Sequence, residues 1–232
     1  MSRFRDILIH NATNGGQHNS SNKTVFKIET SVSNEQFGIA DITGDYVIDW
    51  GDGTAERNLV HKYKNPGVYV IVISGSYTMF SLGYFNTEHA MKVTEILKVS
   101  DNLSGKSIAM FNDCQQITSV PLFDTSRFTS METMFLNCPL LEEVPAFDTS
   151  NVTNFNRVLC NCYNLQEFPE WDFSAGTNFQ ASFRMNSQMR GTPNPACFWN
   201  KSNIVYSKET FMQCSALSNY NEIPASWGGG GA

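Results

Sequence analysis

The sequence has few charged residues, no basic run and no long hydrophobic run. Asp, Glu, Lys and Arg together make up 16% of the 232 residues, and the net charge is −6. Without a cluster of Lys or Arg, we expect no nucleic-acid partner and no attraction to an anionic membrane surface. No stretch reaches the roughly 18 consecutive apolar residues of a membrane helix, so we also expect no membrane insertion.

The beginning of the chain lacks the features of an export signal. Residues 1–10 carry charges and a short apolar patch, Ile7-Leu8-Ile9. They lack both the hydrophobic region of about 7–15 residues and the Ala-x-Ala-like cleavage site of a signal peptide. We therefore expect a protein that is made in the cytosol and keeps this N-terminus.

The sequence also lacks the short motifs that mark common enzymes. It has four His and contains no Gly-x-Ser-x-Gly, His-Glu-x-x-His, phosphate loop or dinucleotide fingerprint. We therefore expect no catalytic residues, no metal and no cofactor.

The chain does contain an internal repeat, with a period of about 24 residues that lies in the range of known repeat architectures. Apolar, cysteine, apolar and aspartate positions recur in the columns Phe111, Phe135, Leu159, Phe183; Cys114, Cys138, Cys162, Asn186; Ile117, Leu141, Leu165, Met189; and Asp124, Asp148, Asp172. A fixed period of this length is typical of a solenoid, in which each unit buries its apolar face only against a neighbour. The aspartates are explained by turn capping.

The spacing of the six cysteines does not indicate a disulfide framework. Four share one repeat column, namely Cys114, Cys138, Cys162 and Cys214. Stacked units would place them about 4.8 Å apart, beyond the roughly 3.5–4.5 Å between Cβ atoms that a disulfide prefers. We expect buried, reduced thiols in this column. Cys160 and Cys197 lie outside it, and the sequence leaves open whether they are exposed or paired.

The N-terminal third has a different pattern. Residues 1–22 end in a polar, turn-rich run and predict an arm that attaches to a partner. Residues 23–76 contain β-type segments at 24–30, 46–50 and 68–73, separated by turns at 51–54 and 65–67. This pattern predicts a small antiparallel β-sandwich.

Part of this segment resembles a known family. Residues 46–54, YVIDWGDGT, followed by His61-Lys62-Tyr63 and Pro66-Gly67-Val68-Tyr69, resemble the PKD family of Ig-like domains. The resemblance implies a non-catalytic spacer or adhesion module. It assigns structural roles to the motif Trp50, Gly51, Asp52, Gly53, His61 and Tyr63. The alternative, a metal or acid–base site at Asp49, Asp52 and His61, is the weaker interpretation.

The repeat region resembles a second family. Residues 134–153, MFLNCPLLEEVPAFDTSNVT, are similar to BspA-like leucine-rich repeats. The resemblance covers residues 93–220 and weakens at 191–206, where four residues are inserted. It implies a mainly β fold in which an Ig-like sandwich (23–76) precedes a solenoid of about five coils with short helical turns and a cap (77–226). We place a strand at Leu141–Val144 in each unit and expect a flexible Gly-rich tail at 227–232.

A PKD-like domain followed by such repeats resembles the layout of bacterial surface proteins and of tailed-phage structural proteins. We expect a non-catalytic structural or accessory protein of a tailed-phage virion, as a capsid decoration or a tail or fibre component on the virion surface. Its partners would be other virion proteins, bound through residues 1–22, or a host-surface protein or glycan; a homo-oligomer is left open. The alternatives are an extracellular bacterial adhesin and, third, a glycan-cleaving enzyme, which would need a pair of carboxylates in a cleft.

The polar positions between the repeat columns are the candidate partner-binding surface. They are Glu142, Glu143, Gln166, Glu167, Glu170, Arg190 and Asn219. Solvated polar residues at these positions would also be expected of any repeat. The aromatic residues Trp171, Phe173, Phe179 and Phe183 could form a sugar-stacking face, but their positions favour core packing. Specific function is expected where the period breaks: residues 1–22, 77–85 and 191–206.

Overall fold

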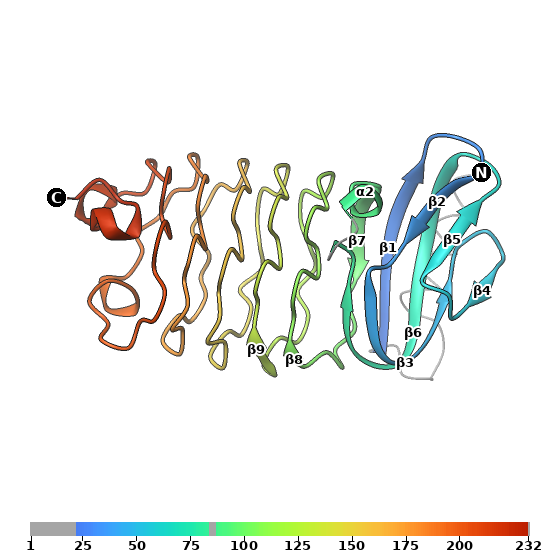
Figure 1. The fold of residues 1–232 in the computed structure, drawn as a ribbon, viewed down its shortest axis with the longest axis horizontal. Helices are drawn as coiled ribbons and strands as arrows, with labels where there is room; N and C mark the ends of the chain where they lie inside the picture. The colour runs from blue at the N-terminus through green and yellow to red at the C-terminus, as the bar shows by residue number, and fades with distance from the viewer. Residues whose placement is uncertain (1–21, 84–86, 232) are drawn as a thin grey trace.

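The computed structural model describes residues 22–83 and 87–231, so the predicted arm lies outside the described residues except for Asn22. The protein is mainly β with few helices, as predicted. Figure 1 shows an elongated molecule with the sheets at one end and a series of turns of chain side by side toward the other.

One antiparallel sheet dominates the N-terminal part. Its strands in spatial order are β4 (Ala55–Glu56), β3 (Asp41–Asp49), β6 (Gly67–Ser81), β1 (Lys23–Thr30) and β7 (Val93–Lys98). The long strand β6 pairs with both β1 and β3. The register of β3 on β6 shifts after Thr43, and Gly75 (φ +131°) lies in this region, where a Cβ would come within 2.3 Å of the Asp45 carbonyl oxygen. Glycine therefore lets the two backbones approach.

A second, two-stranded antiparallel sheet packs against the first. It consists of β2 (Glu35–Gly38) and β5 (Val60–Tyr63). The Phe37 ring lies 6.0 Å from Phe26 of β1 and 6.3 Å from Trp50, and all three side chains are fully buried. The predicted antiparallel β unit is therefore present. Its sheet extends past residue 76, because β6 continues to Ser81 and β7 pairs with β1.

After α2 (Thr87–Ala90) and β7, residues 105–227 form a stack of repeat units, called here the repeat stack. Each unit hydrogen-bonds to the next about one period away. Parallel pairing begins between β8 (Gly105–Lys106) and β9 (Phe128–Ser130). It continues as single parallel bridges in the column Ser130, Asn154, Asn178 and Tyr206. The sequence period is therefore the spacing of hydrogen-bonded neighbours.

The predicted position of the strand in each unit was wrong. Residues 141–144 form no strand, and this side of the unit is tied to its neighbour by single bonds such as Glu142 N–H to Thr118 C=O (2.9 Å). Proline follows at Pro121, Pro145 and Pro169, and proline has no N–H to continue a ladder. Regular pairing lies instead at Phe128–Ser130.

The predicted short helical turns were also wrong for most units. Among the described residues of the repeat stack, helical segments occur only at or after the insertion: η2 (Pro195–Cys197), η3 (Tyr220–Glu222) and η4 (Ala225–Trp227). The other units turn through residues with positive φ, such as Thr133 (φ 54°) and Asn137 (φ 59°). The predicted capping by aspartate holds, since Asp148 Oδ1 accepts the Ser150 N–H at 3.1 Å.

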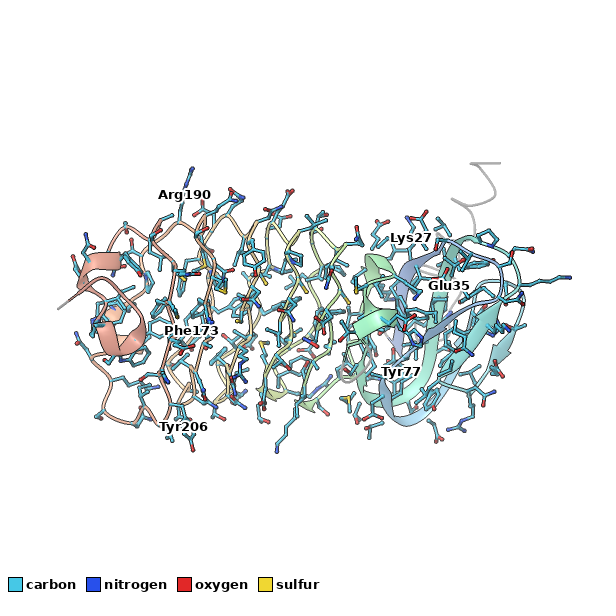
Figure 2. The ribbon with its side chains drawn as sticks, turned by 45° about the horizontal axis from the view of Figure 1, so that its top comes forward. Lys27, Glu35, Tyr77, Phe173, Arg190 and Tyr206 are labelled. Atoms are coloured by element: carbon cyan, nitrogen blue, oxygen red, sulfur yellow. The ribbon has the colours of Figure 1, made fainter. Side chains whose placement is uncertain are left out.

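A single hydrophobic core runs from the sheets into the repeat stack. Stacked ring pairs such as Phe111–Phe135 (5.4 Å) and Phe155–Phe179 (5.4 Å) join consecutive units. The four aromatic residues considered for sugar stacking are buried, as the core-packing alternative predicted; they are Trp171, Phe173, Phe179 and Phe183. Figure 2 shows Phe173 inside the stack.

The cysteines are all unpaired. The four in the repeat column are fully buried, which confirms the prediction of reduced thiols. Cys160 is also buried, whereas Cys197 is partly exposed. Burial raises the pKa of Cys214 to about 12, so this thiol is protonated and unreactive at neutral pH.

The hydrophobic core is covered at both ends of the stack. Phe80 of β6 packs against Phe111 at 5.9 Å, in the segment predicted as a cover; its residues 84 and 85 lie outside the described part. At the other end Trp227 is buried and its carbonyl accepts the Phe211 N–H at 2.8 Å. The prediction of a flexible tail was wrong for residues 227–231, because backbone bonds such as Gly231 N–H to Ile223 C=O (2.9 Å) fold it back.

Candidate partner-binding surface

Three of the predicted surface residues lie in one hydrogen-bonded column. Gln166 N–H donates to the Glu142 carbonyl (3.1 Å), and Arg190 N–H donates to the Gln166 carbonyl (2.8 Å). Consecutive units in such a column lie about 4.8 Å apart. Their side chains therefore form a closely spaced row along one side of the stack.

Six of the seven predicted residues are exposed, and three of these six form the column. We call all six the acidic edge: Glu142, Glu143, Gln166, Glu167, Glu170 and Arg190. Within the described part of the chain, none of their charged groups takes part in an ion pair. Figure 2 shows Arg190 pointing away from the stack. The edge thus offers a row of unpaired carboxylates to a partner.

Asn219, the seventh predicted residue, does not belong to this surface. It is 8% exposed, and its Nδ2 donates to the Pro193 carbonyl at 3.1 Å. The Asn219 side chain therefore holds the inserted segment in place and is too buried to contact a partner.

Sequence reasoning missed the apolar residues near the acidic edge. Leu122 is 68% exposed, Leu140 is 39% exposed and Tyr163 is 41% exposed. Leu140 stands two residues before Glu142, and Tyr163 three before Gln166. Their signal in the sequence is an apolar side chain outside the repeat columns. Acidic and apolar groups together fit a cationic, partly apolar surface.

The insertion creates a hollow of about 330 Å³ next to the acidic edge. Its lining includes Phe168, Glu170, Trp171, Asp172, Cys197 and Phe198. Trp171 Nε1 donates to the Pro145 carbonyl at 2.8 Å, which fixes the indole in the wall.

One of the two carboxylates in the hollow has a structural role. Asp172 Oδ1 accepts the Ser174 N–H (2.8 Å), and hydrogen bonding to Ser174 holds the pKa of this carboxyl below its usual value. Asp124 and Asp148 make equivalent bonds to Ser126 and Ser150. The aspartate column therefore caps turns.

The motif in the β unit has a structural arrangement. The His61 ring stacks on buried Trp50 at 5.3 Å, and Tyr63 Oη donates to the Trp50 carbonyl at 2.9 Å. Gly51 and Gly53 hold positive φ in the turn. Asp52 lies 2.8 Å from His61 Nε2.

Asp52 closes this turn. Its Oδ1 accepts both the N–H (3.1 Å) and the hydroxyl (2.6 Å) of Thr54. Burial alone would raise the pKa of Asp52, but hydrogen bonds from Thr54 and His61 outweigh it and lower the pKa. Over residues 22–83 and 87–231, no group of three or more His, Cys, Asp or Glu could hold a metal ion.

The described helices include none that is long and apolar enough to cross a membrane. A family model described as "Mycoplasma protein of unknown function, DUF285" matches residues 105–227, which are the repeat stack. No curated protein matches the chain, and no solved structure matches it.

Proposed function

The chain belongs to the DUF285 family of proteins of unknown function, and we propose that it is a non-catalytic binding protein built as a display body. In this proposal residues 23–81 form an Ig-like sandwich of the PKD type. Residues 105–227, the repeat stack, form a leucine-rich-repeat solenoid of the BspA type. The sandwich supports the solenoid, and the solenoid presents the acidic edge.

The acidic edge carries the proposal. Its carboxylates are exposed and unpaired, and they project from a backbone that is tied unit by unit through the bonds at Glu142, Gln166 and Arg190. A backbone held this rigidly loses little conformational entropy when a partner binds. Exposed Leu122, Leu140 and Tyr163 add apolar contact area. The partner that fits is a protein surface with Lys or Arg beside apolar groups.

The setting we propose is the surface of a tailed-phage particle, where the protein would serve as a capsid decoration or a tail or fibre component. Its support is the resemblance of the two domains to modules found in such particles. Residues 1–22 would attach the protein to other virion proteins, and the acidic edge would face outward to a host-surface protein.

A bacterial cell-surface adhesin is the second candidate. The family description names a Mycoplasma protein, and because Mycoplasma is a bacterium, this description is what supports the second candidate. In that setting the same edge would bind a host protein or glycan.

The proposal is tested with a charge-reversed edge. The variant Glu142→Lys, Glu143→Lys, Glu167→Lys changes three exposed residues of the edge. The matched control reverses three exposed acidic residues of the N-terminal part, as Glu29→Lys, Asp41→Lys, Glu88→Lys. Wild type and both variants are produced in the source cells, and their amounts in purified phage particles and in cell envelopes are measured by mass spectrometry.

We expect wild type and the control to be found in one of the two fractions, which identifies the setting. A second assay then distinguishes attachment of the protein to the particle or envelope from binding of a partner by the acidic edge. Target cells or host proteins are added to the purified particles or envelopes, and their binding is measured. The edge variant should stay folded and lose at least tenfold in this second binding step. Equal binding by the edge variant and wild type, or absence of the chain from both fractions, would contradict the proposal.

A further inference from the structure

The last repeat unit has an edge that no further unit covers. In each earlier unit N–H groups at alternate residues donate to the following unit. Met131, Phe155 and Phe179 donate to the carbonyls of Asn154, Asn178 and Tyr206 at 2.7–2.9 Å. Two residues on, Thr133, Arg157 and Ala181 donate to Asn156, Gln180 and Lys208 at 2.8–3.0 Å. The equivalent donors in the last unit are Ser207 and Glu209. Neither N–H has an acceptor among residues 22–83 and 87–231.

The same edge also presents a free carbonyl. The carbonyls of Thr129, Thr153 and Thr177 each accept an N–H from the following unit, at 3.0, 2.9 and 2.8 Å. The next carbonyl in this series belongs to Val205, and no described N–H donates to it. Residues 205–209, called here the open edge, therefore offer one acceptor and two donors at alternate residues. This is the hydrogen-bonding pattern of a parallel β-strand that lacks its neighbour.

The side chains of the open edge are suited to contact. Val205 is 64% exposed and Tyr206 57% exposed, and Figure 2 shows Tyr206 pointing out of the stack. A hollow of about 320 Å³ lies along the edge, lined by Gln180, Val205, Tyr206, Ser207, Lys208 and Ser226. The cap leaves this side free, because Trp227 takes up only the Phe211 N–H at the middle of the unit.

We propose that the open edge binds an extended polypeptide segment of a partner protein, which adds to it as a parallel strand. The earlier units fix the register. Three consecutive contacts are expected. One partner residue donates its N–H to the Val205 carbonyl, and the carbonyl of the next partner residue accepts the Ser207 N–H. The carbonyl of the partner residue two positions further along accepts the Glu209 N–H.

Charge defines the partner segment further. The column Glu132, Asn156, Gln180 and Lys208 contains one residue from each unit. The partner residue whose carbonyl accepts the Glu209 N–H would take the next place in this column, beside Lys208. The Lys208 side chain is 80% exposed; its Nζ lies 3.9 Å from Glu209 Oε1, and the other oxygen of that carboxylate pairs with Arg184 at 2.8 Å. An acidic side chain at that partner position therefore pairs with Lys208. A second copy cannot continue the stack head to tail, because the opposite end of the stack adjoins the sheets (Figure 1). This inference is independent of the setting proposed above.

The test uses a probe with this register. A peptide with the sequence of residues 127–133, RFTSMET, is fused to the C-terminus of the full chain through a Gly/Ser linker of about 12 residues, which gives an effective concentration in the millimolar range. The control fusion carries the same residues in scrambled order. Amide hydrogen exchange at Ser207 and Glu209 is measured by NMR in both. We expect exchange at these two amides to be at least tenfold slower with the probe.

Two variants make the result specific. Ser207→Pro removes a donor that the chain itself does not use and should abolish the protection. Lys208→Glu should weaken protection severalfold, and exchanging the probe's glutamate for lysine should restore it, which shows that the variant is folded. Equal exchange with the probe and the scrambled peptide, protection that survives Ser207→Pro, or protection confined to another surface would each overturn the proposal.

Discussion

Ten non-glycine residues hold a left-handed backbone in two columns of the repeat stack. The first column is Ala109, Thr133, Arg157, Ala181 and Glu209, and the second is Asp113, Asn137, Asn161, Met185 and Gln213. Asparagine tolerates this conformation, whereas a β-branched residue is strained in it. The strain is tolerated because the N–H groups of eight of these residues, all but Glu209 and Gln213, donate to the next unit. The Thr133 N–H, for example, donates to the Asn156 carbonyl at 2.8 Å.

Thr133→Gly should therefore stabilise the protein. Glycine adopts φ 54° without a steric cost, so relief of the strain at Thr133 should stabilise the folded protein by roughly 1–2 kcal/mol. The greater entropy of glycine in the unfolded chain offsets part of this, which leaves a net gain in the free energy of unfolding of about 0.5–1 kcal/mol. The measurement is the free energy of unfolding in denaturant. The matched control is Thr129→Gly, at an exposed position with no positive φ, which should be destabilising. Equal losses in the two variants would contradict this explanation of the column.

A pH dependence is expected at Asp52. Its pKa in the folded protein lies below the ordinary value of 3.8, so the ionised group stabilises the fold fully at pH values above the unfolded pKa. That contribution is lost as the pH falls through the folded pKa. The stability difference between wild type and Asp52→Asn should thus be largest above about pH 5 and shrink below about pH 4.

Thermal unfolding across this pH range measures the difference. Asp41→Asn, which makes the same substitution at an exposed aspartate of β3, is the control. A difference for Asp52→Asn that grew on acidification would refute the assignment.

At the scale of the repeat unit, side chains of the cysteine column bond to the preceding units. Cys138 Sγ and Cys162 Sγ donate to the Phe111 and Phe135 carbonyls, both at 3.1 Å. Asn186 occupies the same column and makes more hydrogen bonds than the cysteines do. It is fully buried, its Nδ2 donates to the Leu159 carbonyl (2.8 Å) and its Oδ1 accepts the Cys162 N–H (3.0 Å).

Asn186→Leu should destabilise the protein by about 2–4 kcal/mol, since it leaves the Cys162 N–H and the carbonyls of Leu159 and Phe183 without this partner. Asn186→Cys restores the residue found elsewhere in the column and should cost less, about 1–2 kcal/mol. Both values come from denaturant unfolding. The account of the column would fail if the leucine variant were as stable as the cysteine variant.

The period predicted which residues of a unit are buried, and it did so because core positions must recur when units stack. Phe135, Cys138 and Leu141 are all fully buried. The period could not predict the backbone at Thr133 or the site of parallel pairing at Phe128–Ser130, because both depend on which N–H groups meet a carbonyl in the neighbouring unit.

The candidate surface was partly predictable for the same reason. Glu142, Gln166 and Arg190 each stand one period apart, so their alignment followed from the period. Asn219 lies beyond the four-residue insertion, and its burial depends on a contact with Pro193 that no spacing reveals. The open edge at Val205 and Ser207 was also invisible in the sequence, because it is defined by a missing neighbour.

For the whole molecule, the sheets and the repeat stack form one elongated body with a continuous core (Figure 1). Both proposed binding surfaces depend on this body, since the acidic edge and the open edge are rows of groups held at the spacing of the units. The central claim is therefore that one period of the sequence is the structural unit of the stack.

Deletion of one unit tests that claim most directly. Removing residues 135–158 deletes one full period and joins Met134 to Leu159, which then occupies the column of Phe135. A control deletion of residues 135–156 stops two positions short of a period and shifts every later side chain out of register. Far-UV circular dichroism and thermal unfolding are measured for both. We predict a shorter protein with a cooperative unfolding transition for the full-period deletion and loss of that transition for the control; equal loss in both would contradict the account.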